Sequence, residues 1–222
     1  MNDMRPLRRG DLRDALVAYA RQEADAGHID QMSLRAAARD LGVSSGAVYR
    51  HFADKDALLK AVAHQGFDEL RERFFRIRGE NMRASCPIEA VARAFRMGRA
   101  FVDYAYENPT LWRMMFGRIG LLCREDHNTD PEMTRYTMLD CSAENCRDLH
   151  EMGGLAQPPE IEDIRFVWSA IHGAADLAQS GMRLDGSGRT VVADQTTERS
   201  LRALGCPQKL IEKGRQLLET SS

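Results

Sequence analysis

The chain has 222 residues, of which 43% are hydrophobic and 29% are charged, and its formal net charge is −2 at pH 7. This is the balance of an ordinary globular protein with a sizeable core, and the net charge alone does not indicate a nucleic-acid partner. No stretch has the eighteen or so apolar residues of a membrane span, and the N-terminus lacks the apolar core of a signal peptide, so we expect a cytoplasmic protein with no membrane partner.

The first expected helix spans residues 7–26, and Gly27 ends it. Its apolar residues recur at three- and four-residue spacing and form one buried stripe, Leu12, Ala15, Leu16, Tyr19 and Ala20. Arginines gather at its N-terminal end, at positions Arg5, Arg8, Arg9 and Arg13. They predict a basic arm next to whatever follows this helix.

Residues 33–55, SLRAAARDLGVSSGAVYRHFADK, predict two short helices joined by a tight turn. Ser33 and Ser44 stand where helix N-caps are needed, and Gly42 can adopt the left-handed conformation that ends a helix. On the second helix Val48 and Phe52 face inward. The outer face is then small, hydroxylated, basic and aromatic, and consists of Ser45, Gly46, Ala47, Tyr49, Arg50 and His51. Such a surface suits a nucleic-acid backbone and base edges.

The rest of the chain is expected to be helical. A helix over 54–78 is too long to belong only to a small N-terminal domain, and the polar stretch 79–85 is a candidate boundary. Apolar spacing with proline and glycine boundaries predicts further helices over 87–106, 109–122, 131–152, 160–180, 191–204 and 207–218. Loops are expected at 124–130 and 183–190.

The run LGVSSGAVYRHFADKDAL, with Tyr49, Phe52 and Lys55 at matching spacing, resembles the helix-turn-helix of the TetR family of transcriptional regulators. Trp168 followed by His172-Gly173, with the run ENPTLWRMMFG, is similar to the subgroup whose C-terminal domain is named for a Trp-His-Gly motif. The resemblance implies an all-α fold. The resemblance further implies a three-helix helix-turn-helix DNA-binding domain at residues 1–55 and an antiparallel helical ligand-binding and dimerisation domain at residues 56–222.

On this interpretation the protein is a homodimeric repressor that binds a palindromic operator in double-stranded DNA and is released by a small apolar effector. Ser45, Gly46, Ala47 and Arg50 would approach base edges in the major groove. The resemblance implies that Tyr49, His51 and Lys55 contact phosphates, and that Ser33 and Ser44 add donors at helix N-termini. It also implies a dimer surface formed by residues 160–180 and 191–218.

Aromatic and methionine side chains suit an apolar cavity for the effector between the C-terminal helices. Each one taken singly is more often plain core. The candidates are Phe101, Trp112, Met115, Phe116, Met138 and Trp168, with Cys141 and His172 as polar groups in the wall.

Two Cys-x-x-x-His pairs, Cys123 with His127 and Cys146 with His150, have the spacing of a helical chelate but supply too few ligands for a metal site. We therefore expect no metal and no cofactor. No nucleophile elbow, zinc-protease motif or nucleotide fingerprint indicates an enzyme. The alternative left open is a DNA-binding regulator controlled by metal, thiol oxidation or a protein partner.

Overall fold

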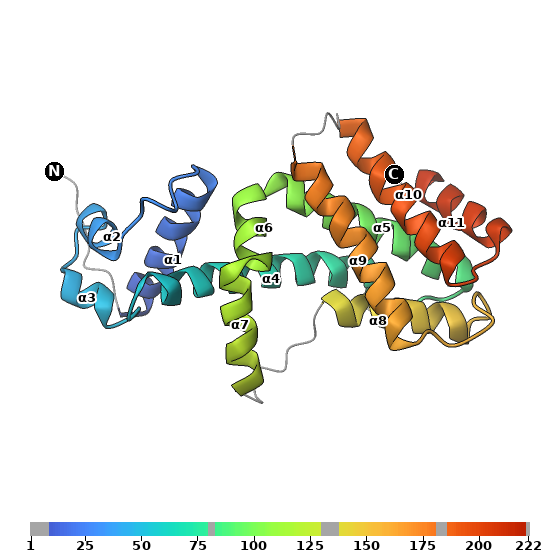
Figure 1. The fold of residues 1–222 in the computed structure, drawn as a ribbon, viewed down its shortest axis with the longest axis horizontal. Helices are drawn as coiled ribbons and strands as arrows, with labels where there is room; N and C mark the ends of the chain where they lie inside the picture. The colour runs from blue at the N-terminus through green and yellow to red at the C-terminus, as the bar shows by residue number, and fades with distance from the viewer. Residues whose placement is uncertain (1–8, 80–82, 130–137, 181–185, 221–222) are drawn as a thin grey trace. The chain divides into compact units, whose positions relative to one another are not determined.

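The computed structural model describes residues 9–79, 83–129, 138–180 and 186–220, and within these ranges the chain forms helices and turns with no strand (Figure 1). The all-α fold is confirmed. The helices are α1 (Arg9–Asp25), α2 (Leu34–Asp40), α3 (Ser45–Tyr49), α4 (Lys55–Arg78), α5 (Pro87–Glu107), α6 (Pro109–Phe116), α7 (Arg118–Thr129), α8 (Met138–Glu151), α9 (Ile161–Gln179), α10 (Gly186–Ala203) and α11 (Gln208–Thr220). Among the described residues no helix is long and apolar enough to cross a bilayer.

The chain divides into two compact units, each made from two stretches of sequence. Unit 1 comprises residues 1–68 and 108–134, and unit 2 comprises residues 69–107 and 135–222. This differs from the expected division between residues 55 and 56. The reason is that α6 packs against α1 and also against the first part of α4, where a Cβ on Gly66 would lie 2.6 Å from Sδ of Met115.

Unit 1 is built around the buried faces of its first helices. The core side chains that lie at or below 2% exposure include Leu16, Val17, Ala38, Val48, Leu58 and Val62. They follow the apolar spacing of the sequence, so the hydrophobic effect places α2 and α3 with a fixed face outward.

Unit 2 is organised around α5, which packs against α8, α9, α10 and α11. Its core includes Val91, Phe95 and Leu149, all fully buried. Close helix approach depends on glycine at two places: a Cβ on Gly214 of α11 would lie 2.3 Å from Cγ1 of Val91, and one on Gly98 of α5 would lie 2.4 Å from Oγ1 of Thr197.

Two expected loops were wrong where the structure describes them. Residues 124–129 belong to α7, and residues 186–190 belong to α10; residues 183–185 and 130 lie outside the described ranges. The single helix expected over residues 109–122 is interrupted at Gly117, which separates α6 from α7. A Cβ on Gly120 would lie 1.7 Å from the Met115 carbonyl oxygen, so the chain turns sharply here only because both residues are glycine.

Candidate functional site

The predicted caps stand at the start of α2 and at the start of α3. Ser33 Oγ accepts a hydrogen bond from the Ala36 amide at 3.1 Å, and Ser44 Oγ accepts one from the Ala47 amide at 3.2 Å. Gly42 has φ of 67°, the left-handed conformation. Because these bonds satisfy donors at helix N-termini, the orientation of α3 is set locally.

The outer face of α3 is open as expected. Ser45, Gly46 and Arg50 are exposed, Tyr49 is 46% exposed, and Ala47 and His51 are half-buried. A Cβ on Gly46 would meet no atom within 4 Å. The backbone at Gly46 is therefore accessible to a large partner.

Lys55 lies at the start of α4 and is already anchored. Its Nζ donates to the Asp30 carbonyl oxygen at 2.9 Å, which joins α4 to the turn after α1. An ammonium has three N–H donors, so this bond leaves capacity for a phosphate. Asp54 caps the same helix by accepting from the Ala57 amide at 2.8 Å.

One supporting contact was not found from the sequence. The Tyr19 hydroxyl of α1 donates to Asp40 Oδ2 at 2.9 Å and so holds α1 against the end of α2. Burial, together with the bond to the Asp40 carboxylate, raises the pKa of Tyr19 to about 12. The hydrogen bond from Tyr19 lowers the pKa of Asp40 from its ordinary value. The pair is therefore a neutral phenol donating to a carboxylate at neutral pH.

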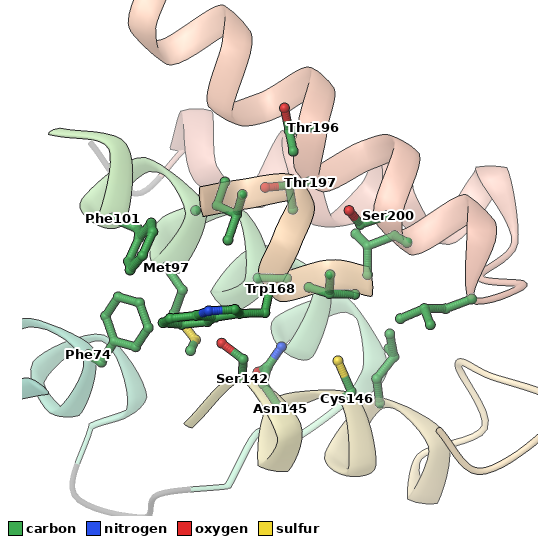
Figure 2. Close-up of a pocket in the computed structure, with 17 residues that line it drawn as sticks. Phe74, Met97, Phe101, Ser142, Asn145, Cys146, Trp168, Thr196, Thr197 and Ser200 are labelled. Atoms are coloured by element: carbon green, nitrogen blue, oxygen red, sulfur yellow. The ribbon is translucent and has the colours of Figure 1, made fainter. Parts of the chain in front are cut away.

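Unit 2 contains a cavity of about 60 Å³ between α5, α8, α9 and α10, with Phe74 of α4 at one end. Figure 2 shows Trp168 of α9 extended across it, next to Phe74 and Phe101. Ser142, Asn145 and Cys146 of α8 lie on one side of this ring, and hydroxyl groups of α10 lie on the other, Thr196, Thr197 and Ser200. Among the described residues, no side chain that lines it is charged.

Two of the residues predicted for the pocket line this cavity, Phe101 and Trp168, whose ring centroids lie 5.1 Å apart. His172 packs against both rings, at 5.7 and 5.8 Å between centroids, but is not part of the lining. Met138 and Cys141 are buried on α8 outside it.

The other three predicted pocket residues belong to unit 1. Trp112 and Phe116 pack with centroids 4.4 Å apart, and Phe116 contacts Phe67 edge to face at 5.6 Å. Met115 is fully buried beside Gly66. They lie on α6, which packs with α1 and α7 in unit 1, and none of them is among the residues that line the cavity of unit 2.

Asn145 and the hydroxyl residues of α10 were missed from the sequence. Asn145 is 3% exposed, Ser200 is 4% exposed and Thr197 is 8% exposed. Buried polar residues on helices that otherwise bury apolar faces are the signal that would have marked them.

In the described part of the chain no group of three or more histidine, cysteine or carboxylate side chains lies close enough together to hold a metal ion. The side chain of His127 lies outside the described residues, and His150 Nδ1 lies 3.1 Å from the Leu155 carbonyl oxygen. Burial raises the pKa of the Cys146 thiol to about 12 and that of Cys206 to about 11. Both are therefore protonated, poorly reactive thiols at neutral pH.

Comparison with known proteins agrees with this arrangement. Residues 16–62 match the family described as "Bacterial regulatory proteins, tetR family", and residues 94–204 match "Tetracyclin repressor-like, C-terminal domain". An HTH-type transcriptional regulator of Mycobacterium tuberculosis is 33% identical over 86 residues, which are 39% of this chain and 35% of the relative. The chain thus spans about a third of the length of the curated relatives that it matches.

Solved structures show the same fold over nearly the whole chain. A protein with unknown function from Rhodococcus sp. RHA1 has a TM-score of 0.70 and 26% identity, covering 90% of this chain and 98% of that one. RolR in complex with the ligand resorcinol has a TM-score of 0.63 and 15% identity, covering 93% of this chain and 94% of that one. Both family matches are to regulators and not to enzymes. The chain belongs to the TetR family of DNA-binding transcriptional regulators.

Proposed function

We propose that this protein is a ligand-responsive repressor that binds a palindromic operator as a homodimer and is released by a small apolar effector. The observation that supports this most directly is that one chain contains both an accessible α3 face and an uncharged, largely apolar cavity. On this proposal Arg50 reads a base edge, while Tyr49, His51 and Lys55 contact phosphates together with the N-termini at Ser33 and Ser44.

The dimer surface is proposed to lie on α9 and α10. Phe166 and Leu177 of α9 are 50% and 48% exposed, and between them Ser169 and Gly173 are exposed at the same helical spacing. A Cβ on Gly173 would meet nothing within 4 Å, so the fold of one chain does not require glycine there. Small residues flanked by large apolar ones suit close packing against a second helix.

The outer face of α11 is polar, in contrast to that of α9, so we narrow the proposed dimer surface. Its exposed residues are all polar or charged before the C-terminal turn: Gln208, Lys209, Glu212, Lys213 and Gln216. On α10, Val191 is 49% exposed. We therefore place the proposed interface on α9 with α10, where desolvation on pairing is favourable, rather than on α11.

The proposed coupling between effector and DNA runs through α4, which begins in unit 1 and ends in unit 2. Its last residue, Arg78, is 2% exposed and forms an ion pair with Glu144 of α8. Glu144 directly precedes Asn145 in the cavity wall. A ligand that shifts α8 would therefore act on the end of α4, and by linkage DNA and effector must weaken each other's binding by the same factor.

The ligand of RolR, resorcinol, is a small molecule, which is consistent with a small effector here. We also propose that the C-terminal domain belongs to the Trp-His-Gly subgroup, since Trp168, His172 and Gly173 lie on α9 and the first two pack together beside the cavity.

The proposed dimer interface is tested by replacing both Phe166 and Leu177 with glutamate and measuring the molar mass of the variant in solution by light scattering. We expect a monomer whose affinity for a selected duplex is at least 10-fold lower, because a single α3 reads too few base pairs. The matched control is Gln216→Glu on α11, which adds one charge to an already polar face. A wild-type monomer, or a variant that remains dimeric, would contradict the proposed interface.

The alternative is a DNA-binding regulator controlled by metal, by thiol oxidation or by a protein partner. Burial of Cys146 and its raised pKa oppose a thiol sensor at that position. Duplex binding is measured after zinc, copper or peroxide treatment and, in parallel, with neutral apolar compounds. Release only by metal or oxidant would replace the effector proposal with this alternative.

A further inference from the structure

Asn145, in the wall of the cavity of unit 2, has a buried acceptor that the described part of the protein leaves unsatisfied. Nδ2 of Asn145 donates to the Ala90 carbonyl oxygen at 3.1 Å, whereas Oδ1 is buried and has no hydrogen-bond partner among the described residues. A buried acceptor without a partner is destabilising, and native proteins contain few of them. Figure 2 shows this amide beside Ser142 and below the ring of Trp168, with the amide nitrogen on the side nearer the ring.

The lining excludes charged ligands. The described wall has no arginine, lysine, histidine or carboxylate, so a carboxylate or an ammonium ion would be desolvated there without a counter-charge. The rings of Phe74, Phe101 and Trp168 instead offer apolar and aromatic contact.

The volume sets the size of the ligand. About 60 Å³ holds a few water molecules, at about 15 Å³ each, whereas a dry cavity of about 150 Å³ accepts a single benzene ring. A one-ring molecule is larger than this space, so we expect it to lie fully inside only where the surrounding helices, α8 among them, are further apart. Such a ligand binds a wider conformation more tightly than the described one, which is the condition for a shift in population.

We infer that the cavity takes a neutral, phenol-like molecule of one or two rings whose hydroxyl donates to Oδ1 of Asn145 while its ring packs against Trp168. This inference rests on the proposed function, because it names the ligand class of the same cavity. The hydroxyl supplies the donor that Oδ1 lacks, and Ala90 keeps the amide oriented from the other side.

The test compares ligand pairs that differ only in the donor, by calorimetry on the full chain. We expect phenol and 2-naphthol to bind at least about 5-fold more tightly than toluene and 2-methylnaphthalene. Only the two hydroxyl compounds can donate a hydrogen bond to Oδ1 of Asn145, which the two methyl compounds leave unsatisfied. Benzoate is expected not to bind. Equal affinity within each pair, binding of benzoate, or no binding of either phenol overturns the inference.

Variants locate the donor's partner. Asn145→Leu, which is similar in size, should remove the preference for phenols, whereas Ser142→Ala, one turn earlier on α8, should retain it. A loss of preference in Ser142→Ala instead would overturn the assignment. If Asn145→Leu does not fold, the comparison of ligand pairs with the wild-type protein decides.

Release of duplex DNA is measured separately. Phenol binding that depends on Asn145 but does not release DNA supports this ligand class and contradicts the effector role. Release by other compounds without any phenol binding contradicts the ligand class and leaves the effector role intact.

Discussion

The close approach of α5 and α10 gives a quantitative prediction at Gly98. A Cβ there would lie 2.4 Å from Oγ1 of Thr197, about 1 Å inside ordinary contact, and 3.4 Å from Cδ1 of Ile171. Thr197 is β-branched and 8% exposed, so its side chain has little freedom to rotate away. Gly98→Ala therefore forces a local overlap in the core of unit 2.

The magnitude follows from two opposing effects. Overpacking of this kind costs about 1–3 kcal/mol. Replacing glycine in a helix interior returns about 0.5–1 kcal/mol. The two ranges leave a net loss of up to about 2.5 kcal/mol in the free energy of unfolding, and about 1 kcal/mol at their midpoints. At about 2–4 °C per kcal/mol for a chain of this size, the midpoint loss lowers Tm by about 2–4 °C.

The assay is thermal and guanidinium unfolding of four proteins: wild type, Gly98→Ala, Thr197→Ala and the double variant. Without the Thr197 hydroxyl the added methyl group has room, so Gly98→Ala in that background should be neutral or stabilising, which gives a coupling energy of about 1–3 kcal/mol. Gly46→Ala is the control for helix propensity, since its Cβ meets nothing within 4 Å. An unchanged Tm in Gly98→Ala, or the same loss in both backgrounds, would refute the described approach of the two helices.

Three further predictions concern DNA recognition, the end of α4 and pH. Arg50→Ala should relax preference at one base position by about 1–3 kcal/mol. Lys55→Ala should instead weaken binding to specific and scrambled duplexes alike and lower the salt slope by about 1, which titrations at several salt concentrations would reveal or rule out. Glu144→Gln should lower the free energy of unfolding by about 1–3 kcal/mol, because its partner Arg78 is buried. In the control, Glu151→Gln, the partner Arg83 is exposed, and the free energy of unfolding should change by less than about 1 kcal/mol. Equal effects of the two substitutions would contradict the role of burial. Burial raises the pKa of the Cys146 thiol from its ordinary value of 9.0 to about 12, so the contribution of this thiol to stability is complete below pH 9.0 and is lost as the pH rises toward 12. Cys146→Ala should flatten this alkaline decline in the free energy of unfolding. Identical unfolding curves of the variant and the wild type at high pH would disprove this prediction.

The helix-turn-helix could be predicted in detail because its determinants are local. Ser33 and Ser44 bond amides three residues away, and Gly42 needs only its own backbone freedom. The apolar spacing of Val48 and Phe52 likewise fixes which face of α3 is buried, since both are at or below 4% exposure. Which of the outward residues contact DNA stays a prediction.

The cavity could not be predicted with the same accuracy. In the sequence Trp112 and Trp168 are both aromatic residues on apolar stretches and cannot be told apart as pocket residues. In the structure α6, which carries Trp112, packs within unit 1, whereas α9, which carries Trp168, packs within unit 2. Asn145 becomes notable only when α5 supplies the Ala90 carbonyl oxygen, 55 residues away, and leaves the other amide atom unsatisfied.

The sequence by itself therefore determined the helices, most of their boundaries and the exposed face of α3, because caps and apolar spacing act within a few residues. Only the tertiary structure decided to which compact unit α6 and α7 belong, how closely Gly98 approaches Thr197, and which polar groups meet inside unit 2. The physical reason is that burying an apolar face requires a partner helix without specifying which one, so the choice is made by packing between segments distant in the chain.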